Sequence, residues 1–209
     1  MTRRLVLATH NEHKIHELRQ ILAAADLDLE VVSSAAYPEL SEIPETEVTF
    51  VGNARLKAEH VAAITGEAAL ADDSGLAVDV LGGSPGVLSA RWSGAHGGAR
   101  LTRAERDARN LRLLLDQLAD VPDAHRRAAF RCAAVLAVPG QEPAVAEGGV
   151  TGVVVREPAG EGGFGYDPIF VPDGDTRTLA QYSDEEKNAV SHRGAALRAM
   201  VPLLRERLA

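Results

Sequence analysis

The sequence lacks the features of secreted, membrane-spanning and nucleic-acid-binding proteins. Its single cysteine, Cys132, excludes a disulfide within the chain and favours a reducing compartment. No apolar run approaches the roughly 20 residues that a transmembrane helix needs. The net charge of −8 is opposite to the basic field that a general DNA or RNA binder carries. These absences predict a soluble, cytoplasmic protein that binds neither membrane nor nucleic acid, although a few local lysines and a metal could still hold a small phosphate ligand.

Aromatic residues are also scarce, at 4% of the chain, so an aromatic in a polar or glycine-rich setting needs an explanation. The core must instead come from small aliphatic side chains, which are abundant within an apolar fraction of 45%. A chain of 209 residues with this composition predicts one globular domain spanning 1–209. Cys132 lies in the apolar stretch 128–138, which favours a buried small hydrophobe over a nucleophile.

The hydrophobic periodicity predicts alternating strands and helices. The apolar run at residues 4–8 is too short for a signal-peptide core and fits a first strand. Further strands are predicted at 30–33, 68–71, 76–81, 128–138 and 149–156. Helices are predicted where apolar residues recur at spacings of three and four. The helical stripes are Ile15, Leu18, Leu22 and Ala25; Val51, Ala54, Ala58 and Val61; Leu111, Leu114, Leu115 and Leu118; and Leu197, Val201, Leu204 and Leu208. Capping boxes at Thr102/Glu105 and Ser183/Glu186 predict two helix starts, and the mixed order predicts an α/β fold with a mixed sheet.

Four segments carry polar residues suited to chemistry. The first is Thr9-His10-Asn11-Glu12-His13-Lys14, between a strand and a helix. A helix start offers free N–H groups and a positive dipole end to an anion. By itself the segment is more typical of a capped helix with a solvated lysine.

The second segment, Asp72-Asp73-Ser74-Gly75, places two carboxylates where the apolar strand 68–71 is expected to stop. Adjacent carboxylates are unfavourable without a compensating cation or solvent. Mg²⁺ commonly takes one or two protein carboxylates with phosphate oxygens and water. An acidic turn, in which the aspartates cap backbone amides, is the alternative.

The third segment is Phe164-Gly165-Tyr166-Asp167, in a glycine-rich loop. Its two aromatics suit a platform for base stacking, or the rings fold back onto the core. The fourth segment contains Lys187, Ser191, His192 and Arg193, of which the two cations are candidate phosphate or base contacts.

Taken in order, these segments resemble the inosine triphosphate pyrophosphatase family, which acts on noncanonical purine nucleoside triphosphates. The likeness covers nearly the whole chain and also includes Glu45-Thr46, Asn53-Ala54 with Lys57, Pro85-Gly86 and Ser89-Ala90-Arg91. The resemblance implies an elongated, two-lobed α/β fold with a long central mixed sheet flanked by helices and an active-site cleft between the lobes. It further implies a homodimer, Mg²⁺ dependence, and hydrolysis of ITP, dITP or XTP to the monophosphate and pyrophosphate.

The resemblance also assigns roles to residues of this chain. Glu45 and Asp73 would hold the metal, Asp73 would help to activate water, and Asp72 would lie beside them. Thr9 to Lys14, Lys57 and Ser74 would line the triphosphate. Phe164 would stack on the base with Gly165, Tyr166 and Asp167 nearby, and Lys187, His192 and Arg193 would complete nucleotide recognition.

One departure is Val51-Gly52 before Asn53, where the family pattern has an acidic residue directly before the asparagine. The spacer Glu47-Val48 also differs from the usual glycine-containing form. Two alternatives stay open: a related pyrophosphatase for modified pyrimidine or methylated nucleotides, and a nucleotide-binding module without enzymatic activity. The acidic residues at 45, 72 and 73 argue against the second, since a mere binder has less need of a metal cluster.

Overall fold

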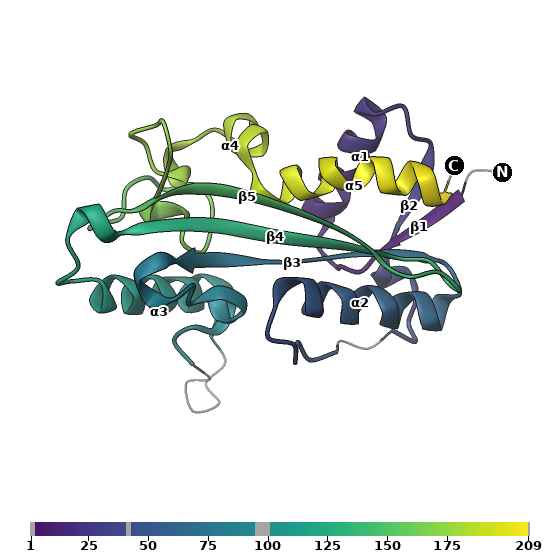
Figure 1. Cartoon of the computed structure of the whole chain (residues 1–209), viewed down its shortest axis with the longest axis horizontal. Coiled ribbons are helices and arrows are strands. Elements are labelled where there is room, and N and C mark those ends of the chain that lie inside the picture. Colours follow the sequence, from purple (N-terminus) through teal and green to yellow (C-terminus); the bar gives the residue numbers. More distant parts are fainter. Residues whose placement is uncertain (1–2, 41–42, 95–100, 209) are drawn as a thin grey trace. The chain divides into compact units, whose positions relative to one another are not determined.

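The computed structural model describes residues 3–40, 43–94 and 101–208 (Figure 1). They divide into two compact units. Unit 1 comprises the described residues of 1–73, 132–148 and 192–209, and unit 2 those of 74–131 and 149–191. The single domain expected over 1–209 stays a prediction.

Six strands form one mixed sheet in the order β2-β1-β3-β4-β5-β6. β1 pairs in parallel with β2 and β3, whereas β5 and β6 are antiparallel. The predicted α/β class with a mixed sheet is therefore confirmed. The strand bounds are β1 Arg3–Leu7, β2 Leu29–Ser33, β3 Ala68–Val78, β4 Arg127–Ala137, β5 Ala144–Val154 and β6 Phe170–Pro172.

Unit 1 has a hydrophobic cluster on each face of its part of the sheet. Leu5 and Leu7 of β1 belong to a cluster with α1 (Glu12–Ala24) and α5 (His192–Leu208), whereas Val6 belongs to a cluster with α2 (Phe50–Thr65). Successive side chains of a strand point to opposite faces, which explains the division. Within this unit, α1 and α5 cover one face and α2 the other (Figure 1).

Unit 2 has its own core, which gathers residues from β3, α3 (Arg103–Gln117), β4 and the glycine-rich loop. Both predicted capping boxes are present, at the starts of α3 and α4 (Asp184–Val190). In each, the side chain of the first residue accepts from the backbone N–H three residues on, and the glutamate accepts in return. Short 3₁₀ turns lie at Ser34–Ala36, Asp79–Leu81, Gly86–Arg91, Asp123–His125, Asp167–Ile169 and Leu179–Gln181.

The structure differs from the predicted elements at β5, α5 and β6, and also at β3, which is described with the site. β5 begins at Ala144 rather than 149, because the two glycines at 148 and 149 lie inside the strand. At Gly148 a Cβ would come within 2.3 Å of the Ala196 backbone nitrogen of α5, so only glycine fits that approach. On α5, Leu197, Leu204 and Leu208 are buried as predicted, but Met200 is fully buried in place of Val201, which is only partly buried. The short strand β6 was not predicted.

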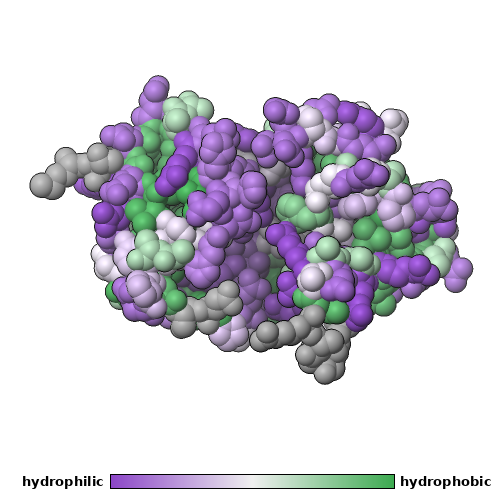
Figure 2. Space-filling view, turned by 180° about the vertical axis from the view of Figure 1, so that it is seen from behind, coloured by the Kyte–Doolittle hydropathy of each residue, from purple (hydrophilic) through white to green (hydrophobic). Residues whose placement is uncertain are grey.

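Polar and apolar residues are interspersed on the face shown in Figure 2. Among the described residues, no helix has both the length and the apolar character to cross a membrane.

Candidate functional site

Asp72 and Asp73 lie in the interior of β3, which runs unbroken from Ala68 to Val78. The prediction that the strand stops at these residues is therefore wrong, and the acidic-turn alternative is excluded with it. Both aspartates are buried, with exposed fractions of 7% and 9%. Two adjacent carboxylates can be buried in a strand only if cations or donors compensate them, and these come from distant parts of the chain.

Asp72 is held by two cations of unit 1. The Lys14 ammonium donates to both of its carboxylate oxygens, at 2.9 and 2.8 Å, and Arg193 Nε donates to Oδ2 at 3.2 Å. Burial alone would raise the pKa of Asp72, but the charges of Lys14 and Arg193, with that of Lys57, lower it well below its ordinary value. Asp72 is therefore a permanent anion that fixes the positions of Lys14 and Arg193.

Glu17 is a member of this group that the sequence analysis did not identify. It lies three residues after Lys14 on α1, and its carboxylate is 3.9 Å from Nη1 of Arg193. Burial raises the pKa of Glu17, and the charge of Arg193 opposes that shift. The signal in the sequence was the i,i+3 spacing from Lys14, which places both side chains on one face of the helix.

The two predicted metal carboxylates, Glu45 and Asp73, both lie close to Lys57. The Lys57 ammonium is 3.1 Å from Glu45 Oε1 and 3.9 Å from Asp73 Oδ1, and it donates to the Asp72 carbonyl at 2.7 Å. Residues 28 positions apart in the sequence thus meet at one positive charge.

Asn53 is fully buried on α2 and orients Asp73. Its Nδ2 donates to Asp73 Oδ2 at 3.0 Å, while its Oδ1 accepts from the Glu47 backbone N–H at 3.0 Å. One side chain therefore joins the catalytic candidate Asp73 to the chain segment after Glu45. Asn53 belongs to one of the motifs of the family resemblance, but the sequence alone indicated no role for it.

The residue types around Glu45 and Asp73 fit Mg²⁺ in one particular mode. Among the described residues, no three His, Cys, Asp or Glu side chains gather closely enough to enclose a metal ion by themselves. Mg²⁺, however, usually binds through one or two carboxylates and takes its other ligands from phosphates and water. Two carboxylates beside one lysine fit a metal that arrives with a phosphate ligand.

The segment Thr9 to Lys14 forms the predicted junction between β1 and α1. Asn11 is the N-cap and accepts from the His13 N–H at 3.0 Å, and Thr9 Oγ1 accepts from the Asn11 N–H at 3.2 Å. His10, Glu12 and His13 are exposed. Only Lys14 of this segment is shown to contact the buried carboxylates.

In unit 2, Phe164 presents a half-exposed ring, with 48% of its surface accessible. Two cations lie over that ring: Lys187 Nζ at 4.3 Å and Arg103 Cζ at 4.6 Å from the ring centre. An exposed aromatic face beside positive charge suits a stacked nucleobase. Arg103 was not singled out in the sequence, because nothing local connects it with Phe164.

Asp167 fixes the shape of the loop that carries Phe164. The buried carboxylate accepts from the Phe164 N–H at 2.8 Å and from the Lys187 ammonium at 2.6 Å. Gly163 adopts φ +72°, and a Cβ there would lie 2.4 Å from Asp167 Oδ2, so this position requires glycine. Gly165 N–H donates to Asp107 of α3 at 3.1 Å, which ties the loop to that helix.

The two aromatics of the loop lie in different surroundings. Tyr166 is 4% exposed, belongs to the core of unit 2, and donates its hydroxyl hydrogen to the Ser89 carbonyl at 2.9 Å. Burial raises the pKa of Tyr166. The alternative of a ring folded onto the core thus describes Tyr166, while Phe164 alone offers an accessible ring.

The remaining predicted residues are divided between the units. Ser74 follows Asp73 and is the first residue of unit 2, and His192 opens α5 in unit 1. Lys187 and Arg193, expected to act together, have separate partners: Lys187 contacts Phe164 and Asp167 in unit 2, and Arg193 contacts Asp72 in unit 1.

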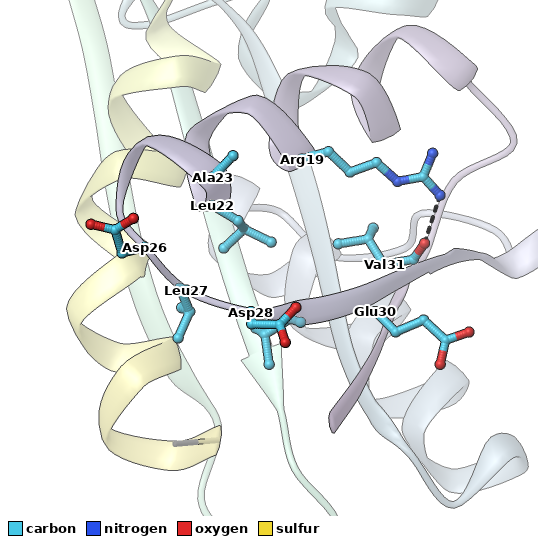
Figure 3. Close-up of a pocket in the computed structure, with 9 residues that line it drawn as sticks. Arg19, Leu22, Ala23, Asp26, Leu27, Asp28, Glu30 and Val31 are labelled. Atoms are coloured by element: carbon cyan, nitrogen blue, oxygen red, sulfur yellow. Dashed lines mark hydrogen bonds between the residues drawn. The ribbon is translucent and has the colours of Figure 1, made fainter. Parts of the chain in front are cut away.

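A separate open depression of about 630 Å³ lies beside α1 and β2 (Figure 3). None of the predicted site residues line it, and Arg19 in its wall donates to the Val31 carbonyl at 2.8 Å. Its other charged lining residues, Asp26, Asp28 and Glu30, are acidic. Such a lining does not suit a phosphate ligand.

The chain is similar to known proteins along nearly its whole length. A model of the Ham1 family matches residues 5–203. The chain is 55% identical over 205 residues to a dITP/XTP pyrophosphatase of Streptomyces coelicolor, covering 98% of each chain. It is 54% identical over 203 residues to the dITP/XTP pyrophosphatase of Frankia alni, covering 97% of this chain and 98% of that one.

Solved structures give the same result. A HAM1 protein from Coxiella burnetii is 38% identical, with a TM-score of 0.87 over 98% of this chain and 100% of that one. A nucleoside-triphosphatase, dITP/XTP pyrophosphatase, from Mycobacterium abscessus is 49% identical, with a TM-score of 0.80 over 97% of this chain and 100% of that one. The matched range therefore spans the positions of every motif on which the family resemblance was based.

Proposed function

This chain belongs to the Ham1 family, and we propose that it hydrolyses noncanonical purine nucleoside triphosphates, ITP, dITP and XTP, to the monophosphate and pyrophosphate. Relatives with more than half of their residues identical are named dITP/XTP pyrophosphatases, which supports the substrate class. The protein would thereby remove damaged nucleotides from the pool.

The observation that carries the proposal is the group of cations around β3 in unit 1. Lys14, Lys57 and Arg193 come from three different helices and meet at Asp72 and Asp73. In the protein alone, carboxylates balance these three positive charges. A divalent metal held by Glu45 and Asp73 would tip the local charge to positive and so favour a polyanion in a protein of net charge −8. In the proposed complex, Lys14 and Lys57 contact the triphosphate, and Asp72 keeps Lys14 in place until the phosphates arrive.

Glu45 and Asp73 are proposed to hold Mg²⁺. Bound there, Mg²⁺ would neutralise phosphate charge and lower the pKa of a coordinated water. Lys57 lies beside both carboxylates and would then turn its ammonium toward the phosphates, as a mobile point charge.

The reaction is a displacement at the α-phosphorus. A water oxygen forms a bond to the α-phosphorus, the bond to the bridging α,β-oxygen breaks, and pyrophosphate leaves with the electron pair. Asp73 accepts the proton of the attacking water, and Asn53 holds the other carboxylate oxygen so that Asp73 keeps one orientation. Charge builds on the phosphate oxygens, so electrostatic stabilisation by the lysines carries most of the rate.

The base is proposed to stack on Phe164, the exposed ring of unit 2. Selection of hypoxanthine and xanthine over adenine requires donors aimed at the 6-keto oxygen, because a donor there meets another donor in the adenine amino group. Lys187, His192 and Arg193 are the proposed polar contacts of the nucleotide. We further propose that the protein is a cytoplasmic homodimer.

The test is a pyrophosphate-release assay with ITP, dITP, XTP, GTP and ATP, with Mg²⁺ and with EDTA. We expect turnover of the first three well above that of ATP, and no turnover with EDTA. Asp73→Asn, which preserves the shape of the side chain, should fold but lose activity by at least about a hundredfold. Faster turnover of a modified pyrimidine triphosphate would favour the related pyrophosphatase, and nucleotide binding without turnover would favour the binding module.

A further inference from the structure

Arg103, the first residue of α3, lies over the ring of Phe164. Its side chain is 60% exposed, and its carboxylate neighbour is Asp107, one turn along the helix at 3.8 Å. Lys187, the second cation over the ring, is instead fixed by a 2.6 Å contact to Asp167, whose side chain is only 5% exposed. Of the two cations on the ring, Arg103 is therefore the one that a ligand can move at little cost.

The backbone beneath Arg103 is held in place on both sides. Thr102 and Glu105 form the capping box that fixes the first turn of α3. Asp107, on the next turn, accepts from the Gly165 N–H and so ties α3 to the loop that carries Phe164. Any adjustment at Arg103 is then a rotation of its side chain, with the guanidinium remaining within reach of the ring.

We infer that Arg103 is a substrate-binding residue: its guanidinium leaves the Phe164 ring when a purine stacks there and packs on the outer face of the base. Phe164 and Arg103 would then enclose the base from both sides. A guanidinium is planar and weakly hydrated, and it stacks on aromatic faces more readily than an ammonium does. This inference rests on the proposed function, in that it takes Phe164 as the platform for the base.

The test is calorimetric binding of IMP and of pyrophosphate, the two products of the proposed reaction, because neither is consumed. Arg103→Ala should raise the Kd for IMP by roughly three- to thirtyfold and leave the Kd for pyrophosphate within about twofold. The matched control is Arg112→Ala. Arg112 lies on the same helix and pairs with an aspartate four residues on, as Arg103 does, so its loss removes the same charge without the ring contact.

If the role of Arg103 were merely electrostatic, Arg103→Ala would weaken the binding of IMP and of pyrophosphate together, and Arg103→Lys would bind both as the wild type does. The inference is overturned by that result, by equal effects of Arg103→Ala and Arg112→Ala, or by tighter IMP binding in Arg103→Ala, which would make Arg103 only a cover for the ring.

Phe164→Ala distinguishes a failure of this inference from a failure of the proposed function. If it weakens IMP by roughly ten- to a hundredfold while Arg103→Ala changes nothing, only the present inference fails. If Phe164→Ala also changes nothing, the proposed base platform fails. Should Arg103→Ala not fold, Arg103→Gln keeps the length of the side chain and removes its charge and guanidinium plane.

Discussion

Asp72 and Asp73 are neighbours in the sequence, yet each has its own set of partners. Asp72 is bound by Lys14 and Arg193, whereas Asp73 is oriented by Asn53 and lies near Lys57. The division follows from strand geometry, in which successive side chains point to opposite faces. One aspartate is therefore available to position cations while the other is available for a metal and for water.

The Lys14–Asp72 pair leads to a prediction about both stability and substrate binding. Lys14→Ala removes the cation that contacts both oxygens of a buried carboxylate, leaving Arg193 as the other bound cation. We expect a loss of roughly 1–3 kcal/mol in the free energy of unfolding and an increase in KM for ITP of about tenfold. Urea unfolding and steady-state kinetics measure the two effects.

The double variant Lys14→Ala/Asp72→Asn provides the control. With a neutral amide at position 72, part of the lost stability should return, because the buried carboxylate no longer lacks a cation and Arg193 keeps Glu17 as a carboxylate neighbour. The increase in KM should persist. A double variant less stable than Lys14→Ala would contradict this account of the pair.

Glu17 leads to a prediction about pH. Its pKa is raised by burial, so the folded protein keeps a proton that the unfolded chain releases near the ordinary value of about 4.3. Between the ordinary pKa and the raised pKa of Glu17, the folded state binds more protons than the unfolded state does. The free energy of unfolding therefore falls as the pH rises through this interval. Glu17→Gln removes this loss, so the Tm of the variant minus that of the wild type should increase between pH 4 and pH 7. Glu59→Gln, an exposed carboxylate on α2, is the comparison; an equal change there would argue against burial as the cause.

At the scale of elements, the turn at Pro85 and Gly86 packs closely beside β3, the strand that carries Asp72 and Asp73. A Cβ at Gly75 would lie 2.4 Å from both the Gly86 carbonyl oxygen and Ser89 Oγ. Ser89 Oγ in turn accepts from the Leu76 N–H at 2.9 Å and donates to the Gly86 carbonyl at 2.6 Å. The glycine after Ser74 is thus required by this close approach and not by an unusual φ angle.

Gly75→Ala should therefore destabilise the protein by roughly 1–3 kcal/mol, the usual cost of overpacking. It should also lower activity, because β3 must shift next to Asp73 and Ser74. Thermal unfolding and pyrophosphate release measure the two effects. Gly149→Ala is the matched control: it also lies in a strand, but the nearest atom to its Cβ would be 3.2 Å away. Similar losses in both variants would mean that the contact with Ser89 is not the cause.

At the scale of the whole molecule, the two compact units share three strands, since β3, β4 and β5 each contribute residues to both. Cys132 is the first residue of β4 that belongs to unit 1, and it is 2% exposed. Burial raises the pKa of its thiol to about 12. The chain thus contains one buried thiol that reports on the opening of the sheet.

Native protein should react with Ellman's reagent at pH 8 only as fast as it unfolds, while guanidinium-unfolded protein should react at once. Ligands that bind the folded state lower the population of the open form, so IMP or pyrophosphate should slow the labelling. Reaction of the native protein on the time scale of mixing would show that Cys132 is accessible.

The sequence by itself determined the helices, most of the strands and the family. Apolar spacing placed α1 and α2, the capping boxes placed the starts of α3 and α4, and the ordered motifs identified the relatives. These signals are local, because helix caps and helical stripes depend on residues three or four positions apart. Dependence on local signals also explains the wrong prediction at β3. Two aspartates followed closely by a glycine are typical of a turn when their distant partners are not known.

Only the tertiary structure decided which residues meet. Lys14 and Arg193 are 58 and 121 positions from Asp72, and no periodicity connects them. Phe164 and Tyr166 are alike in the sequence, but one ring is exposed beside Arg103 and the other is buried against Ser89. Burial of a charge or a ring depends on what packs around it, and packing is set by the whole sheet and its helices rather than by neighbours along the chain.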